Sequence, residues 1–199
     1  KVIRNVPFKK HFNDIEKKER FIIYQGALNL GRGIELMIDA MQFIDDYKLY
    51  IIGSGDVEKQ LSERIAEKSL TGKIIMIGRL PFSEIWEYTS KASLGLSLEE
   101  NLGLNYYYAL PNKLFDYIRA RKPVIVSNLP EMKNIVEKYN IGKILTEREP
   151  EKLAETILSI VNNQKYLDEI KANLEIASEE LCWEKEKDKL IDLYVNASE

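Results

Sequence analysis

Cysteine and histidine are nearly absent from this chain of 199 residues, which has one of each, Cys182 and His11. A single cysteine excludes an internal disulfide framework and a metal site built from several thiolates. One histidine argues equally against a His-based metal site, so we expect no metal in this domain. The chain also lacks any apolar run near the ~20 residues of a membrane-spanning helix, and no signal peptide is visible. These absences are typical of a cytoplasmic protein.

Neither sign of charge is in excess, because 29 basic residues stand against 32 acidic ones for a net charge of −3. The balance gives no reason to expect nucleic acid as a partner, although local basic spots can still bind phosphates. Hydrophobic residues make up 45% of the chain, enough to bury a core in one large domain or two small ones. The first residue is Lys1 rather than methionine, so we expect the chain to be part of a longer protein.

Short apolar runs recur along the chain and are apolar on both faces, as strands of a parallel sheet covered on both sides should be. They lie at residues 20–26, 48–55, 73–79, 93–98, 122–128 and 142–145. Segments of helical period separate them, for example Met132, Ile135 and Tyr139. The alternation predicts an α/β fold with a Rossmann-like, doubly wound parallel sheet of about six strands.

The two ends of the chain differ from this alternating part. Residues 1–20 are polar, charged and weakly periodic, which is typical of a connecting segment. After about residue 163 two helical stretches follow without a strand, joined near "ELCWEKE". We therefore divide the chain into an entry segment at 1–20, a Rossmann-like domain at 21–180 and a C-terminal helix at 181–199.

Glycines stand at the ends of the predicted strands, where open parallel sheets bind ligands near helix N-termini. Gly26 ends the first strand, Gly53 and Gly55 the second and Gly78 the third. Glycine lets the backbone approach a ligand, and free N–H groups of the next helix attract phosphate. The alternative is that glycines simply end strands, as they do in every α/β fold.

The stretch "GSGDVE" does not complete a dinucleotide-binding motif, because Glu58 stands where the third glycine of GxGxxG belongs. We favour a tight turn with Asp56 as the helix N-cap. This disfavours a dehydrogenase. No GxxxxGK[ST] or GxSxG motif occurs, and one histidine makes a Ser-His-Asp triad improbable.

Two cations stand at predicted helix starts, where the positive end of the helix dipole disfavours them unless an anion shares the site. Arg32 precedes Gly33 at the start of an amphipathic helix, and Lys113 follows the N-cap candidate Asn112. Phosphate is the obvious anion, and a solvated surface arginine is the alternative. Asp116, one turn further on, is placed either to accept from a ribose diol or to compensate the helix dipole.

Several stretches together resemble the C-terminal, nucleotide-sugar-binding domain of retaining glycosyltransferases of the GT-B fold, in their large family four. These stretches are "YQGALNLGRGIELMIDA", "LYIIGSG", "IIMIGRLPFSEIWEYTSKAS", "NKLFDYIRARKPVIVS" and "EMKNIV". The match runs from about residue 21 to 157 in the order and spacing of the family pattern. Each piece is weak, whereas the combination is specific.

The resemblance implies roles for individual positions. Arg32 takes the place of the family lysine that holds the donor diphosphate, and Asp116 takes that of the glutamate that binds ribose hydroxyls. Backbone near Gly78 would hold the base. The donor-binding residues implied in this way are Gly26, Arg32, Gly33, Gly53, Gly78, Arg79, Leu80, Asn112, Lys113 and Asp116.

The sequence also departs from the family pattern. Ala27 stands where an arginine usually contacts phosphate, and Tyr108 stands where the first glutamate of the E-x7-E motif belongs. Glu99 or Glu100, displaced by a longer loop, would then contact the donor sugar. The tyrosines at 106–108 either shape the sugar pocket or pack on the domain surface.

The expected function is therefore that of the donor-binding domain of a retaining, hexosyltransferase-like enzyme of cell-surface polysaccharide synthesis. It would transfer a sugar from a nucleotide-diphosphate sugar, without a cofactor, to an acceptor glycan or lipid-linked glycan. The resemblance implies that an N-terminal domain binds the acceptor and that the C-terminal helix at 181–199 packs back toward that domain. It also implies that this chain alone is inactive and that the whole protein is peripheral to the membrane. The alternatives are half of a nucleotide-sugar 2-epimerase and a non-catalytic nucleotide-binding α/β module.

Overall fold

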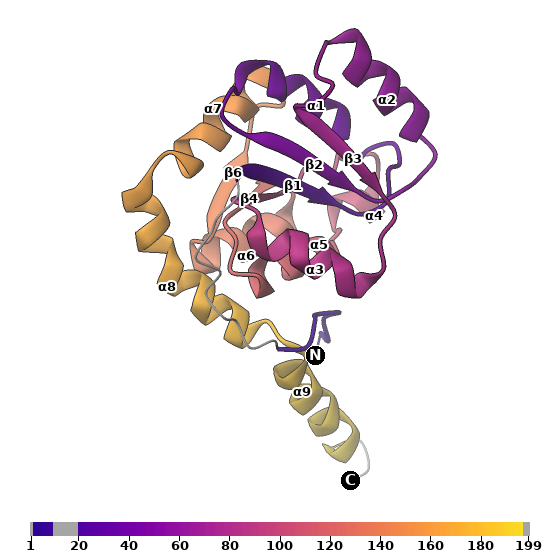
Figure 1. Cartoon of the computed structure of the whole chain (residues 1–199). Coiled ribbons are helices and arrows are strands. Elements are labelled where there is room, and N and C mark those ends of the chain that lie inside the picture. The colour runs from indigo at the N-terminus through magenta and orange to yellow at the C-terminus, as the bar shows by residue number, and fades with distance from the viewer. Residues whose placement is uncertain (1, 10–19, 197–199) are drawn as a thin grey trace.

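The computed structural model describes residues 2–9 and 20–196 and contains a six-stranded parallel sheet (Figure 1). The strands are β1 (Phe21–Gln25), β2 (Lys48–Ile52), β3 (Ile74–Gly78), β4 (Leu94–Ser97), β5 (Val124–Ser127) and β6 (Gly142–Leu145). Their order across the sheet is β3-β2-β1-β4-β5-β6. The order reverses between β1 and β4, and an open α/β sheet binds ligands at such a switch point. The prediction of a Rossmann-like α/β fold is confirmed.

Helices cover both faces of the sheet because its strands are apolar on both sides. Along β1, Ile22 and Tyr24 belong to one core cluster and Phe21 and Ile23 to the other. The helices on the first face are α1 (Ile34–Ala40), α2 (Glu58–Glu67) and α7 (Pro150–Val161). Those on the second are α3 (Phe82–Lys91), α5 (Asn112–Arg119), α6 (Pro130–Tyr139) and α8 (Gln164–Glu180). Two short elements, η1 (Met41–Phe43) and α4 (Leu104–Tyr107), lie in connections.

Tyr117, on α5, ties the two strands at the switch point together. Its hydroxyl lies 3.2 Å from the backbone nitrogen of Gln25 in β1 and 3.2 Å from the carbonyl oxygen of Leu96 in β4. The ring is fully buried and lies against Gly95, where an added Cβ would come within 2.4 Å of it. Gly95 therefore makes room for Tyr117, whose hydroxyl links β1 and β4.

Two helix starts differ from the sequence prediction. Asn112 is the first residue of α5, and its N-cap is Pro111. Asp56 precedes Val57, which is the N-cap of α2. The backbone nitrogen of Asp56 instead donates to Asn29 Oδ1 at 3.3 Å, and that of Val57 donates to the carbonyl of Leu28. Contacts with the loop after β1 therefore set this helix start.

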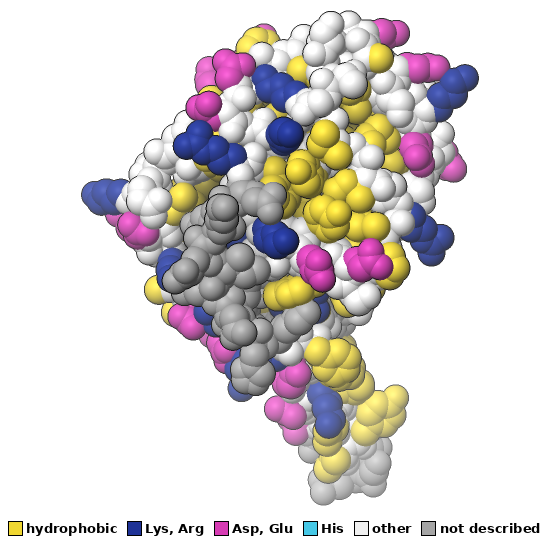
Figure 2. All heavy atoms as spheres, in the orientation of Figure 1, with side chains coloured by type: hydrophobic (Ala, Val, Ile, Leu, Met, Phe, Trp, Pro, Cys, Tyr) yellow, Lys and Arg dark blue, Asp and Glu magenta, His cyan; other side chains and the backbone are white. Residues whose placement is uncertain are grey.

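The C-terminal helices follow the predicted order, with the joint at Leu181 and Cys182 between α8 and α9 (Trp183–Asn196). Residues 2–9 lie against this joint, where the backbone nitrogen of Trp183 donates to the carbonyl of Pro7 at 2.9 Å. Helix α9 extends away from the sheet and exposes Ile191, Tyr194 and Val195 (Figure 2). That it packs toward a further domain stays a prediction, and residues 10–19 of the predicted entry segment, with His11, lie outside the described residues.

Within residues 2–9 and 20–196, no helix combines the length and the apolar character that crossing a membrane requires.

Candidate functional site

Two adjoining pockets open at the carboxyl ends of β1, β2 and β3. The larger, of about 520 Å³, is lined by Gln25, Gly26, Ala27, Arg32, Phe82, Ile85, Leu110, Pro111, Asn112, Lys113 and Asp116. The smaller, of about 360 Å³, is lined by Gly26, Ala27, Ile52, Gly53, Ser54, Arg79, Leu80 and Ile85. They share Gly26, Ala27 and Ile85, and the larger extends to the N-terminus of α5. We take them as one candidate site.

Another pocket of about 500 Å³ lies at the opposite, amino-terminal edge of the sheet, with Arg20, Tyr47 and Lys73 in its lining. Its rim is formed by strand starts, whereas ligands of open parallel sheets bind beyond the strand ends, where helices begin. The volumes of the pockets at the two edges are similar and do not show which one binds a ligand. The direction of the strands favours the pockets at the carboxyl edge.

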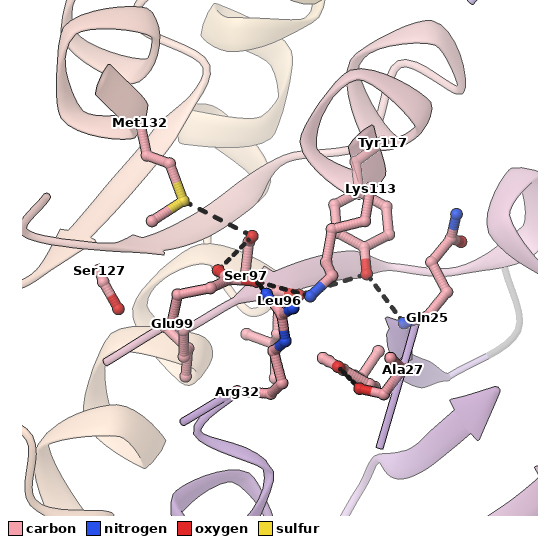
Figure 3. A network of polar contacts seen from close by, with 12 residues as sticks. Gln25, Ala27, Arg32, Leu96, Ser97, Glu99, Lys113, Tyr117, Ser127 and Met132 are labelled. Atoms are coloured by element: carbon pink, nitrogen blue, oxygen red, sulfur yellow. Dashed lines mark hydrogen bonds and ion pairs between the residues drawn. The ribbon is translucent and has the colours of Figure 1, made fainter. Parts of the chain in front are cut away.

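A buried cluster of charge forms the inner wall of the larger pocket (Figure 3). Glu99, which follows β4, is fully buried and accepts from Lys113 Nζ at 2.7 Å and from the Ser97 hydroxyl at 2.8 Å. Arg32 Nη1 lies 3.8 Å from the same carboxylate. The ammonium of Lys113 also lies over the ring of Tyr24, 4.4 Å from its centre. The cation in the first turn of α5 therefore has an anion within the chain.

Burial and pairing oppose each other in this cluster. Burial by itself would raise the pKa of Glu99, but the Lys113 ammonium and the hydrogen bonds from Lys113 and Ser97 outweigh it, so that pKa is lowered. Burial also lowers the pKa of Lys113, although Glu99 counteracts it. With 2.7 Å between Nζ and Oε1, the two groups have the geometry of an ion pair, and charges that close stabilise each other in a low-dielectric site.

Arg32 retains unused hydrogen-bonding capacity. Its Nε is buried and has no hydrogen-bond partner among the described residues. Its guanidinium lies 5.6 Å from the centre of the Tyr106 ring and lines the larger pocket. A buried donor without an acceptor is costly, and the exposed part of the same guanidinium, which lines the pocket, can bind an anion there.

Gly26 allows the backbone to pass close to this cluster at the end of β1. It has φ 139°, and an added Cβ would lie 3.2 Å from Lys113 Cε. Only glycine adopts such a φ readily. A larger residue here would be strained, and its Cβ would crowd the Lys113 side chain.

Asp116 also lines the larger pocket and contacts the last residue of β1. Its Oδ2 accepts from Gln25 Nε2 at 3.1 Å, and its Oδ1 lies 3.4 Å from Arg119 Nη2. Burial raises the pKa of Asp116 to about 6, against the opposing effects of Arg119 and Gln25. Keeping Asp116 ionised at neutral pH therefore lowers the stability of the ligand-free protein.

Asp116→Asn tests this cost. Because the folded-state pKa lies above the ordinary value of 3.8 for an aspartate, the folded state binds more protons than the unfolded state between these pH values. Stability then falls as pH rises from about 4 to about 6. Asparagine mimics the protonated form, so in the ligand-free protein at pH 7 the variant should be more stable by roughly 2–3 kcal/mol. Urea unfolding at pH 4 and pH 7 measures this. An equal difference at both pH values would contradict it.

The structure brings most of the predicted site residues together. Gly26, Arg32, Asn112, Lys113 and Asp116 line the larger pocket, and Gly53, Arg79 and Leu80 line the smaller one. Two predicted residues adjoin the pockets without lining them. Gly33 is the left-handed N-cap of α1, and Gly78 is the last residue of β3.

The acids and tyrosines after β4 are placed differently. The Glu99 carboxylate faces Lys113 and Ser97, whereas Glu100 is partly exposed and lies 3.5 Å from Arg148 Nη2. Tyr107 and Tyr108 are exposed and meet edge to face, with ring centres 4.9 Å apart. Contact of either acid or of the tyrosines with a sugar stays a prediction.

Sequence reasoning missed Gln25 and Arg148. Gln25 is a single polar residue at the end of an apolar strand, and that position was the available signal. Arg148 precedes α7 and holds the loop after β4 through the carbonyl of Leu98 and the hydroxyl of Ser127, both at 3.0 Å. Nothing in the local sequence indicates this contact.

Comparisons with known proteins agree with this geometry. Residues 5–175 match the family model described as "Glycosyl transferases group 1", and the chain belongs to this family. It is 27% identical over 168 residues to an uncharacterized glycosyltransferase from Methanocaldococcus jannaschii, covering 83% of this chain and 45% of that protein.

Solved structures show the same fold. A sucrose-phosphate synthase from Thermosynechococcus elongatus superposes with TM-score 0.79 at 19% identity, over 90% of this chain and 45% of that one. The Anabaena protein HepE, solved in complex with UDP and glucose, gives TM-score 0.76 at 16% identity, over 90% and 49%. The chain therefore spans about half the length of the proteins it matches.

Proposed function

We propose that this chain is the donor-binding part of a retaining glycosyltransferase and holds the nucleoside diphosphate of a sugar nucleotide at the switch point of its sheet. The observation that carries the proposal is the presence of unlike groups in the lining of one open pocket. Arg32 and Lys113 provide positive charge beside Gly26, and the Asp116 carboxylate lines the same pocket. A nucleoside diphosphate offers the complementary groups, its phosphate oxygens and its ribose hydroxyls.

The two adjoining pockets match the two parts of such a ligand. The base would enter the smaller pocket, against Leu80 and the backbone around Gly53, and the diphosphate would lie across Gly26 toward Arg32. The donor sugar would extend toward Glu100 and the tyrosines after β4. Because Arg32 and Lys113 already supply positive charge there, we propose that binding needs no divalent metal.

We extend the proposal to catalysis and acceptor binding. This chain alone transfers no sugar. The acceptor, a glycan or a lipid-linked glycan, binds through a further domain at the membrane surface in the cytoplasm. Support comes from the relatives, of which this chain covers about half.

Calorimetric titration of the chain with UDP, ADP and GDP, with and without EDTA, tests the proposal. We expect weak binding of one of them, unaffected by EDTA. Absence of binding to all three would overturn the donor-binding role, and rapid sugar transfer by this chain alone would overturn the need for a further domain.

Arg32→Ala separates phosphate recognition from folding. Loss of a charge-assisted hydrogen bond should weaken binding of the nucleoside diphosphate by about 1.5–3 kcal/mol and leave binding of the nucleoside unchanged. Arg20→Ala is the matched control, because Arg20 is an exposed arginine at the opposite edge of the sheet. Equal losses for nucleoside and diphosphate would show that Arg32 acts on the fold instead.

A further inference from the structure

A buried glutamine stands beside the proposed ribose-binding carboxylate. Gln25 is the last residue of β1, is 4% exposed, and follows four buried residues of which none is charged. Its Nε2 donates to Asp116 Oδ2 at 3.1 Å, and its Oε1 lies 2.6 Å from the Thr89 hydroxyl on α3. A buried amide is costly unless both ends are paired, and here both are.

The chemistry of these partners fixes the direction of the amide. Turned over, the amide would set its carbonyl oxygen against the Asp116 carboxylate, which would be repulsive. Thr89 is 1% exposed, and its hydroxyl, which also lies 2.9 Å from the carbonyl of Ile85, faces the amide oxygen. Gln25 therefore presents its NH₂ group to Asp116 from a rigid strand end.

Asp116 is held at two places. Gln25 contacts Oδ2 and Arg119 lies 3.4 Å from Oδ1, so the plane of the carboxylate is set between a strand and its own helix. Without Gln25, the remaining side-chain partner in the part of the chain that the structure describes is Arg119, one turn along α5. The torsion that turns an aspartate carboxylate is soft. The Asp116 carboxylate would then rotate toward the Arg119 guanidinium and away from the pocket.

We propose that Gln25 is a positioning residue, which with Thr89 behind it aims the Asp116 carboxylate at the ribose hydroxyls of the bound nucleotide. This inference rests on the proposed function and adds a residue that contacts no phosphate or sugar oxygen itself. Its effect should therefore appear only in ligands that carry the ribose diol.

Gln25→Met keeps the length of the side chain and removes the amide, and titration with UDP and with its 2′,3′-dideoxy analogue provides the test. The wild-type chain should bind UDP more tightly than the analogue. In the variant this ratio of affinities should fall about tenfold, because UDP binding weakens while the analogue binds as before. Thr89→Val should lower the ratio less, because the Gln25 amide remains. Gln42→Met is the control and should change neither affinity, because Gln42 is an exposed glutamine of η1 whose amide donates to the backbone carbonyl of Asp39 in α1.

A ligand-free measurement accompanies the titration. The hydrogen bond from Gln25 lowers the pKa of Asp116, so the carboxyl should titrate at higher pH in Gln25→Met than in the wild type, as followed by carbon NMR. An unchanged titration would overturn the inference, because the contact would then be absent in solution. So would an undiminished preference for UDP, or an equal loss for both ligands. Failure of the wild-type chain to bind UDP, ADP or GDP would instead overturn the proposed function.

Discussion

Gly53→Ala should destabilise the protein by about 4 kcal/mol, the sum of a backbone strain and a steric clash of about 2 kcal/mol each. Gly53 has φ 146°, and an added Cβ would lie 1.8 Å from the carbonyl oxygen of Gly26. The backbone nitrogen of Gly53 also donates to the carbonyl of Gly78 at 2.9 Å. One methyl group would thus separate the ends of β1, β2 and β3, and denaturant unfolding would measure the loss.

Gly72→Ala is the matched control. Gly72 also has a positive φ, 88°, but an added Cβ would meet nothing within 4 Å. Alanine there should cost only the strain of a left-handed residue, about 1–2 kcal/mol. Similar losses at both positions would show that the close approach of Gly53 to Gly26 does not hold in solution. A far larger loss at Gly53 would show that the strand ends are packed backbone to backbone.

The fold could be predicted because each strand carries its own local signal. A strand buried on both faces must be apolar throughout, and the six apolar runs contain the six strands. The pairing order could be assigned only through the resemblance, since no local pattern says that β1 lies between β2 and β4. The predicted N-cap at Asp56 was wrong because contacts with the loop after β1 set the start of α2. The one at Asn112 was wrong by one residue, since Pro111 is the N-cap of α5.

The candidate site was predictable in its members but not in their pairing. Arg32, Lys113 and Asp116 were identified from charges at helix starts and from the family pattern, and all three line one pocket. The pairing of Lys113 with Glu99 joins residues on different elements, so a sequence pattern of helical period cannot show it. A cation at this helix start calls for a nearby anion, and the chain itself provides one, the Glu99 carboxylate.

Glu99→Leu should destabilise the protein by about 3–5 kcal/mol, the usual cost of leaving one charge of a buried pair uncompensated. Lys113, with 8% of its side chain exposed, would keep an ammonium over the Tyr24 ring with no carboxylate beside it. Arg32 would lose the same partner but is 30% exposed, so water can reach it. Denaturant unfolding at pH 7 would measure the effect, and a loss below about 1 kcal/mol, typical of a surface pair, would contradict burial of this cluster.

The double variant Glu99→Leu/Lys113→Met distinguishes folding from ligand binding at the same site. Replacing both charges of a buried pair by apolar side chains of similar size is often neutral for stability, so most of the loss in Glu99→Leu should be recovered. The positive charge of a residue that lines the pocket would nevertheless be gone. If Lys113 contacts the donor diphosphate, as we propose, this well-folded variant should bind UDP about tenfold more weakly and uridine as before. Undiminished UDP binding would show that Lys113 serves only to hold Glu99, and that Arg32 and the backbone at Gly26 receive the phosphates without it.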